Sequence, residues 1–318
     1  MDKEWCQSGE PTVSVAIPCY NEAVTIAKVV KDFRFVLPLA AIHVFDNNST
    51  DGSDILAVNA GAVVHRVRRQ GKGNVMRAIF DTINADAVIV VDGDGTYCAE
   101  EAPTLLKPIF DAEADMVVGN RLRRTTNESL TRLHQFGNRL IVGSINRMFR
   151  TSYEDILSGY RAFSRRFIES VPLLTPGFET ETELTLQALS HGMDVLEIPV
   201  SYLRRPSGSV SKLRTFYDGY RIMLTAIILL RDQYPLRVYG LGSLVCIIIA
   251  VAAFLLRSLS YLGVESFPVP LLTGLILLFL PLAVVTFSFG LLLNVINVRF
   301  RELIQIMRRS RPKYDRLK

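Results

Sequence analysis

Two aspartates separated by one glycine follow an apolar run in the segment AVIVVDGDGTY, residues 87–97. In an extended chain, residues i and i+2 project to the same side, so Asp92 and Asp94 can share one hard divalent cation such as Mg²⁺ or Mn²⁺. The glycines at positions 93 and 95 leave room for a bulky anion to approach the backbone. A DxD triplet is also a common acidic turn, so it predicts a metal and diphosphate site only when other polar groups join it.

Other polar groups of this kind follow two more apolar runs, PCYNE after VSVAI and DNNSTDGS after AIHVF. The fragment RQGKGN adds Lys72 and backbone N–H groups at a helix start, where a phosphate or Asp92 could bind. It lacks the GxxxxGK[ST] pattern, which argues against P-loop ATPase chemistry. Ligands of open parallel sheets bind outside the carboxyl ends of the strands. The three strand ends therefore predict one shared crevice.

The elements that must position these groups alternate along the chain. Apolar runs at 13–18, 41–45, 61–66, 87–91 and 115–119 are separated by segments of helical periodicity, which predicts a mostly parallel α/β sheet. Asn21 is placed to cap the first helix and Asp51 the second.

Beyond position 119, GYRAFS and DVLEIPVSY read as further strands, with the helix ETELTLQALSHG between them. Glu181 and Glu183 open that helix, where its dipole favours acids. The helix dipole therefore explains these two glutamates at least as well as a role in catalysis does.

Two long uncharged stretches near the C-terminus predict a membrane hairpin. Residues 238–256 and 266–298 carry no charge, and about 20 helical residues cross a hydrocarbon core of about 30 Å. Two buried core helices are the alternative interpretation. Arg and Lys flank the pair on its outer sides, whereas the link holds only Arg257, so both termini are expected in the cytoplasm. The formal net charge of +5 is then explained without nucleic acid.

The N-terminus lacks the apolar core of a signal peptide, and the four cysteines show no CxxC spacing, which indicates reduced cytoplasmic thiols. The predicted organisation is a cytoplasmic α/β domain over 1–212, an amphipathic juxtamembrane helix region over 213–236, two transmembrane helices within 237–300 (about 238–258 and 268–296), and a basic cytoplasmic tail over 301–318.

Several segments occur in the order used by family 2 glycosyltransferases of the GT-A fold: VSVAIPCYNEAVTI, FDNNSTDGS, GKGNVMRAIF, VIVVDGDGTY and MVVGNR. The downstream segments DILSGYRAFSRR, GFETETELTLQAL and RRPSGSVSKLRTFYDGYRI, followed by two spans, resemble the polyprenyl-phosphate glycosyltransferases, which include dolichol-phosphate mannose synthase. The resemblance covers about residues 11–300. It implies a Rossmann-like GT-A domain that transfers a sugar with inversion and with a divalent metal.

The resemblance also assigns site residues. Nucleotide-sugar binding is implied for Pro18, Tyr20, Asn21, Glu22, Asp46, Asn48, Lys72, Asp92, Gly93 and Asp94. Binding of the acceptor phosphate is implied for Arg121, Arg132, Arg205, Ser211 and Lys212. Metal binding is implied for Asp92 and Asp94, with Asp94 as the direct ligand. The implied catalytic residues are Asp94, Arg121, Arg132 and Lys212. Thr96 stands where mannose-synthase relatives often carry Gln, so its access to the metal stays open.

The expected reaction moves a single sugar from a nucleotide-sugar, with a UDP-sugar favoured and GDP-mannose as the alternative, to polyprenyl or dolichyl phosphate. The expected location is integral to the membrane, among membrane lipids, with no nucleic-acid partner and with a homo-oligomer left open. A polysaccharide synthase with a sugar acceptor is a second interpretation, although such synthases usually carry more spans and a QxxRW motif, and the only tryptophan here is Trp5. A non-catalytic, membrane-anchored nucleotide-sugar binding protein is a third.

Overall fold

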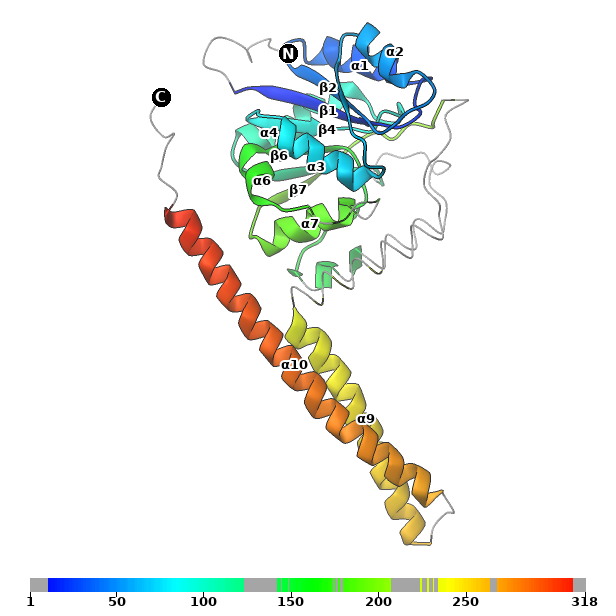
Figure 1. The fold of residues 1–318 in the computed structure, drawn as a ribbon. Coiled ribbons are helices and arrows are strands. Elements are labelled where there is room, and N and C mark those ends of the chain that lie inside the picture. Colours follow the sequence, from blue (N-terminus) through cyan, green and yellow to red (C-terminus); the bar gives the residue numbers. More distant parts are fainter. Residues whose placement is uncertain are drawn as a thin grey trace. The chain divides into compact units, whose positions relative to one another are not determined.

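The computed structural model describes residues 11–122, 142–143, 145–147, 149–173, 175, 177, 180–206, 224, 228, 231, 234–263 and 268–310, the last eleven by backbone alone. The chain divides into two compact units, Met1–Ala226 and Ile227–Lys318 (Figure 1). Most of the expected juxtamembrane helix at 213–236, and residues 311–318 of the expected tail, lie outside the described residues.

The first unit is built on one seven-stranded mixed sheet with the strand order β3-β2-β1-β4-β6-β5-β7. The strands are β1 (Val13–Cys19), β2 (Ala41–Asp46), β3 (Val63–Arg66), β4 (Ala87–Val90), β5 (Met116–Asn120), β6 (Arg161–Ser164) and β7 (Val195–Pro199). Only β6, among these strands, runs antiparallel to its neighbours β4 and β5. The expected mostly parallel α/β sheet is confirmed, and so is the late strand GYRAFS.

Helices cover both faces of this sheet (Figure 1). They are α1 (Ile26–Val36), α2 (Ser53–Asn59), α3 (Lys72–Thr82), the 3-10 turn η1 (Ala99–Glu101), α4 (Ala102–Phe110), α6 (Arg165–Ser170) and α7 (Thr180–Ser190). One core packs α1 and α4 against the sheet, and the other packs α3, α6 and α7 against its opposite face. Successive strand residues enter opposite cores, as Ile89 and Val90 do, which explains why the strands are apolar throughout.

The segment between β1 and α1 differs from the expectation that Asn21 caps the first helix. Thr25 precedes the helix, which has no side-chain cap, and Asn21 adopts a positive φ of 53°. Its Oδ1 instead accepts the Thr50 N–H at 2.8 Å. The prediction was wrong because the loop pairs with the segment after β2 rather than with its own helix. Gly52, rather than Asp51, precedes α2, which also has no side-chain cap, so the expectation for Asp51 was wrong as well, although its Oδ1 accepts the Ser53 N–H at 3.1 Å.

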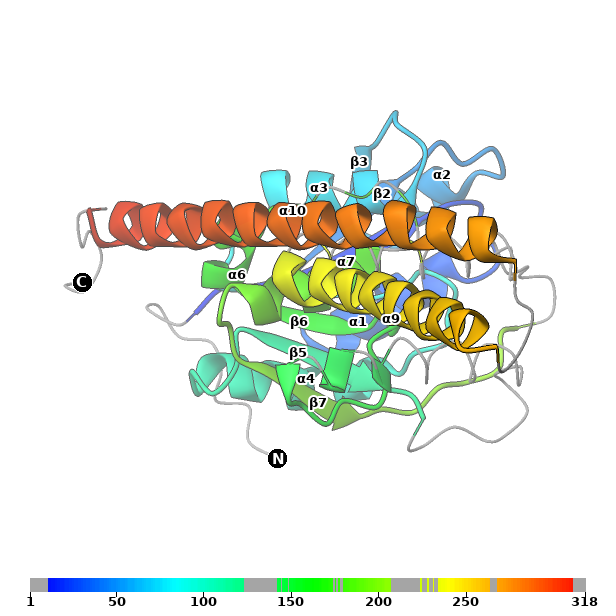
Figure 2. The same ribbon diagram turned by 90° about the horizontal axis from the view of Figure 1, so that it is seen from below.

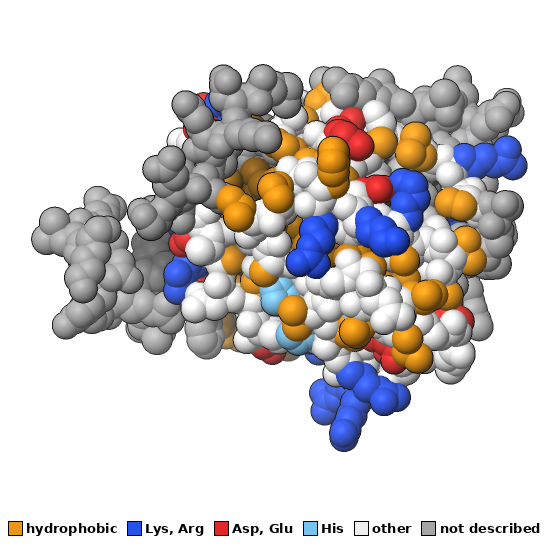
Figure 3. All heavy atoms as spheres, turned by 90° about the horizontal axis from the view of Figure 1, so that it is seen from above, with side chains coloured by type: hydrophobic (Ala, Val, Ile, Leu, Met, Phe, Trp, Pro, Cys, Tyr) orange, Lys and Arg blue, Asp and Glu red, His pale blue; other side chains and the backbone are white. Residues whose placement is uncertain are grey.

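The surface of the first unit is mixed in character. On the face seen in Figure 3, hydrophobic side chains are dispersed among Lys, Arg and uncharged polar groups. Apolar side chains such as Phe35 and Ile55 are exposed in this unit, at 87% and 63%. Hydrophobic residues scattered in this way are ordinary for the surface of a water-facing domain.

The second unit is a two-helix hairpin formed by α9 (Pro235–Tyr261) and α10 (Val269–Ser310), which lie side by side (Figure 2). Small residues line their contact, and the Ser243 hydroxyl donates to the Ala283 carbonyl oxygen at 2.8 Å. Among the described residues, these are the two helices long and apolar enough to cross a membrane, with mean hydropathies of 2.5 and 2.6. Only 17% and 11% of their most apolar windows are buried, which disfavours the interpretation as soluble core helices.

Candidate active site

The carboxyl ends of β1, β2 and β4 meet at one edge of the sheet, because β1 pairs in parallel with both of its neighbours. A Cβ added at Gly93 would lie 3.2 Å from the Pro18 carbonyl oxygen, so the turn after β4 touches the end of β1. Asp46 ends β2, is 4% exposed, and accepts the Ser49 N–H through its carboxylate. The strand ends therefore come together as the sequence predicts.

The segment expected to hold the nucleoside is fixed by the loop after β2. The Asn21 N–H donates to Ser49 Oγ at 2.9 Å, and the Glu22 N–H donates to Ser53 Oγ at 2.8 Å. Glu22 is 8% exposed, whereas Tyr20 is 38% exposed at the same edge. These contacts give the PCYNE segment a defined backbone beside the carboxyl ends of the strands.

Two asparagines after β2 organise the next loop. Asn47 Nδ2 donates to the carbonyl oxygens of Val67 and Arg69, and Asn47 Oδ1 accepts the Gly71 N–H at 2.8 Å. Asn48, expected near the nucleotide, has a positive φ of 65° and donates to the Arg68 carbonyl oxygen. Sequence reasoning missed Asn47, although its place in DNNS was a usable signal. It holds the loop that delivers the start of α3.

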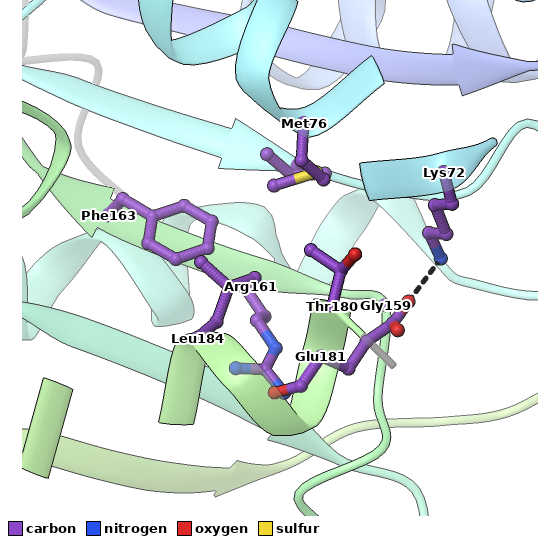
Figure 4. Close-up of a pocket in the computed structure, with 9 residues that line it drawn as sticks. Lys72, Met76, Gly159, Arg161, Phe163, Thr180, Glu181 and Leu184 are labelled. Carbon is purple, nitrogen blue, oxygen red and sulfur yellow. Dashed lines mark hydrogen bonds and ion pairs between the residues drawn. The ribbon is translucent and has the colours of Figure 1, made fainter. Parts of the chain in front are cut away.

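The Lys72 ammonium at the start of α3 is clamped between two carboxylates. Its Nζ lies 2.6 Å from Asp92 Oδ1 and 2.6 Å from Glu181 Oε1, and the latter contact is the dashed line in Figure 4. Burial alone would lower the pKa of Lys72, but the charges of Asp92 and Glu181 outweigh it and raise that pKa above its ordinary value. Lys72 is therefore a fixed positive charge, and Glu181 does more than start a helix.

The Asp92 carboxylate fits against a bare backbone position. A Cβ added at Gly159 would come within 2.3 Å of Asp92 Oδ2, so any side chain there would displace the carboxylate. Gly159 immediately precedes Tyr160 and β6 in the segment LSGY. Its closeness to Asp92 is not visible in the local sequence pattern, because the two residues are far apart along the chain.

A buried arginine, Arg161, holds the backbone next to the Lys72–Glu181 ion pair. Arg161, 1% exposed, donates to the carbonyl oxygens of Ile156, Ser158 and Glu181 and to Thr185 Oγ1. Burial lowers its pKa to about 10, so the guanidinium stays charged at neutral pH. A cavity of about 10 Å³, with room for one water molecule, lies beside it (Figure 4). Arg161 thus fixes the backbone from which Glu181 reaches the lysine.

Asp94 is held by its own turn on one side and by an arginine on the other. Its Oδ1 accepts the Thr96 N–H at 3.1 Å and the Thr96 hydroxyl at 2.6 Å, while its Oδ2 lies 2.6 Å from Arg205 Nη2. Burial and the charge of Asp92 raise the pKa of Asp94, and the charge of Arg205 opposes them. Thr96 therefore holds Asp94 in position through two hydrogen bonds.

The chemistry of these side chains fits a divalent cation. Asp92 and Asp94 stand two residues apart in the turn after β4, and the charge of Asp92 contributes to raising the pKa of Asp94. Counting Glu181, three carboxylates face the two cations Lys72 and Arg205, which leaves one net negative charge. No three His, Cys, Asp or Glu side chains within the described residues converge on one point. Two carboxylates would leave the remaining positions for water and phosphate, as Mg²⁺ and Mn²⁺ prefer.

The residues expected at the acceptor phosphate divide into two groups. Arg121 is described, and its Nε and Nη2 donate to both oxygens of the fully buried Asp155 at 2.7 and 2.9 Å. Burial alone would raise the pKa of Asp155, but Arg121 holds it below its ordinary value. The planar fork of Arg121 is thus paired with Asp155, and its expected use on the acceptor phosphate stays a prediction. Arg205 is also described and pairs with Asp94, whereas Arg132, Ser211 and Lys212 lie outside the described residues.

Comparison with known proteins places this chain in a family. The model of glycosyl transferase family 2 matches residues 14–171. Glycosyltransferase AglJ of Haloferax volcanii is 38% identical over 229 residues, which cover 72% of this chain and 75% of that protein. The chain belongs to glycosyl transferase family 2. This glycosyltransferase is also 29% identical over 223 residues to polyprenol monophosphomannose synthase of Mycolicibacterium smegmatis, covering 63% of this chain and 80% of the synthase.

A solved structure supports the fold of this family 2 enzyme. Glucosyl-3-phosphoglycerate synthase from Mycobacterium tuberculosis, in complex with Mn²⁺, uridine-diphosphate and phosphoglyceric acid, superposes with a TM-score of 0.56 at 22% identity. The match covers 70% of this chain and 78% of the synthase. This likeness confirms the expected GT-A-like fold.

Proposed function

We propose that this glycosyltransferase moves one sugar from a nucleotide-sugar to polyprenyl or dolichyl phosphate, with inversion and with a divalent cation. The observation that carries the proposal is the charge arrangement at the carboxyl edge of the sheet, where Asp92 and Asp94 lie against Lys72 and Arg205. Two apolar helices of membrane-span length in the same chain, and a relative named for polyprenol phosphate, favour a lipid acceptor.

In this proposal the donor lies across the ends of β1, β2 and β4. Pro18, Tyr20, Asn21, Glu22, Asp46 and Asn48 surround the nucleoside, and Gly93 allows the diphosphate to approach. When bound to Asp92 and Asp94, a divalent cation would supply Lewis-acid stabilisation of the negative charge on the leaving diphosphate. Lys72 adds a positive charge that is already in position. A UDP-sugar remains favoured as donor, and the uridine diphosphate in the structural neighbour supports it.

The acceptor phosphate needs placement more than activation. A phosphate monoester is largely ionised near pH 7, so its oxygen can attack the anomeric carbon without a strong general base. A single displacement inverts the configuration, and no covalent enzyme intermediate is needed. Arg205, with Arg132, Ser211 and Lys212, is proposed to hold this phosphate. Arg121 is proposed to act through Asp155, by fixing the wall of the site.

The hairpin explains how a water-soluble donor meets a lipid. We propose that α9 and α10 anchor the enzyme in the membrane with both termini in the cytoplasm, because basic residues flank the pair on its outer sides. The reaction would then take place at the cytoplasmic surface of the membrane.

The test is a transfer assay with the full chain purified in detergent. A panel of radiolabelled UDP- and GDP-sugars is offered with polyprenyl phosphate, with and without EDTA, and the label is followed into the organic phase. We expect one donor to label the lipid, and EDTA to reduce the rate by about a hundredfold or more. Nucleotide binding without lipid labelling by any donor would contradict the proposal and favour a sugar acceptor or a binding protein.

The Glu181→Gln variant tests the lysine clamp. The amide removes one of the two negative charges that hold Lys72. The Lys72 ammonium is then paired with Asp92 alone, and it neutralises the carboxylate that the proposed divalent cation needs. We expect the turnover number to fall by about 10- to 100-fold, measured in the same transfer assay. Glu100→Gln, on an exposed residue, is the matched control. A Glu181→Gln enzyme with wild-type turnover would show that the clamp has no catalytic role.

A further inference from the structure

The contact between Asp94 and Arg205 joins two functions that the sequence assigns separately, one to the donor and one to the acceptor. Arg205 Nη2 lies 2.6 Å from Asp94 Oδ2, and Asp94 Oδ1 is already used by Thr96. Asp94 Oδ2, the carboxylate oxygen that its own turn leaves available, is therefore paired with a guanidinium. A divalent cation binding there would be repelled by that positive charge.

The geometry of the chain shows why Arg205 reaches this position. The Leu203 N–H donates to the Thr96 carbonyl oxygen at 2.8 Å, and Tyr202 forms an antiparallel bridge with Tyr97. These backbone contacts fasten the segment after β7 to the turn that carries Asp94. Arg205, two residues after Leu203, is thus positioned beside the Asp94 carboxylate by these backbone contacts.

The two cations of the site differ in how easily they can leave. Lys72 is enclosed, with 14% of its side chain exposed and a carboxylate on each side. Arg205 lies at the rim, with 30% of its side chain exposed. An exposed side chain on a flexible stem can exchange a carboxylate for another anion at lower cost than an enclosed one. Arg205 is therefore the cation that an arriving metal would displace.

We propose that Arg205 is an exchangeable counter-ion: it neutralises Asp94 while no divalent cation is bound, and the cation displaces it toward the acceptor phosphate. The second half of this proposal rests on the proposed function. Because binding linkage is reciprocal, the acceptor phosphate should then strengthen metal binding by capturing the displaced arginine. Arg205 acts here as a positioning residue that couples donor and acceptor.

The first test measures Mn²⁺ affinity of the full chain in detergent, without donor or lipid, from the electron paramagnetic resonance signal of free Mn²⁺. We expect Arg205→Gln to bind Mn²⁺ about tenfold more tightly than the wild type, which equals about 1.4 kcal/mol. Arg204→Gln, on the exposed neighbouring arginine, removes the same charge and should change the affinity less than about twofold. Equal or weaker binding by Arg205→Gln, or an equal gain in both variants, would overturn the proposal.

The second test adds polyprenyl phosphate in mixed micelles to the same titration. We expect the lipid to tighten Mn²⁺ binding by the wild type about threefold or more, and to leave Arg205→Gln unchanged. If the tenfold gain of Arg205→Gln is seen but the lipid affects neither protein, the counter-ion role stands and the lipid acceptor is wrong. Equal tightening in both proteins would overturn the role of Arg205 in coupling while supporting the acceptor.

Discussion

The Asp94→Asn substitution is expected to lower the rate of sugar transfer by about a thousandfold. Asparagine keeps the shape of the side chain and can still accept the hydrogen bonds from Thr96, so the turn should persist. It removes the charge that attracts Arg205 now and the proposed metal during the reaction. The loss should therefore fall on the chemistry rather than on folding.

Three measurements separate this expectation from a folding defect. The variant should keep its thermal midpoint in detergent, lose measurable Mn²⁺ binding, and remain inactive when Mn²⁺ is raised to saturation for the wild type. Asp54→Asn, on an exposed residue of α2, is the matched control and should transfer at the wild-type rate. An Asp94→Asn enzyme within tenfold of the wild type would show that the metal site has been assigned to the wrong carboxylate.

The Asp155→Asn substitution is expected to lower the free energy of unfolding of the first unit by about 3–5 kcal/mol. Asp155 is fully buried and binds both Nε and Nη2 of Arg121, so an amide leaves a buried guanidinium without its counter-charge. For a unit of this size the loss corresponds to a fall in Tm of roughly 10 °C. Thermal unfolding followed by far-UV circular dichroism at pH 7 measures it.

The matched control for this pair is Asp111→Asn. Asp111 pairs with Lys107 on the surface of α4, where 70% of the lysine side chain is exposed. Exposed ion pairs contribute about 0–1 kcal/mol, so its Tm should barely change. A similar Tm for both variants would mean that the Arg121–Asp155 pair contributes no more than a surface contact.

The pH dependence of the Asp155→Asn effect follows from the lowered pKa of Asp155. A carboxyl whose pKa is lower in the folded state stabilises the protein above its unfolded pKa, and this contribution is lost as the pH falls through the folded value. The difference in Tm between wild type and variant should therefore be constant from about pH 7 to pH 5 and should narrow below about pH 4. A difference that grows on acidification would contradict the assignment.

The sequence predicted the scaffold of the site well because its signals are local. Strands apolar on both faces, glycine-rich turns and the DxD spacing each depend on a few neighbouring residues, and the structure confirms the sheet that they imply. The helical hairpin could be predicted equally well, because a stretch of about 20 residues without charged side chains can be recognised from composition alone. Parallel pairing of β1 with β2 and β4 then brings the polar strand ends to one edge.

The partners of the charged residues could not be predicted in this way. Glu181 was explained by the helix dipole, yet it pairs with Lys72, which lies more than 100 positions earlier in the sequence. Arg121 was assigned to the acceptor phosphate by the resemblance, which did not indicate that its fork pairs with Asp155. Asn21 had the residue type of a helix cap, but its side-chain oxygen instead accepts the N–H of Thr50, in a loop distant in the sequence. In each case the competing partner lies outside any local pattern.

The sequence by itself determined a parallel α/β domain, its carboxyl-edge acids and an apolar hairpin. Each of these follows from the periodicity and residue types of short segments, which set local structure and burial. Only the tertiary structure decided which charges neutralise one another, because Coulomb energy depends on distance and burial rather than on separation along the chain. Lys72 between Asp92 and Glu181, and Arg205 on Asp94, are therefore products of the fold.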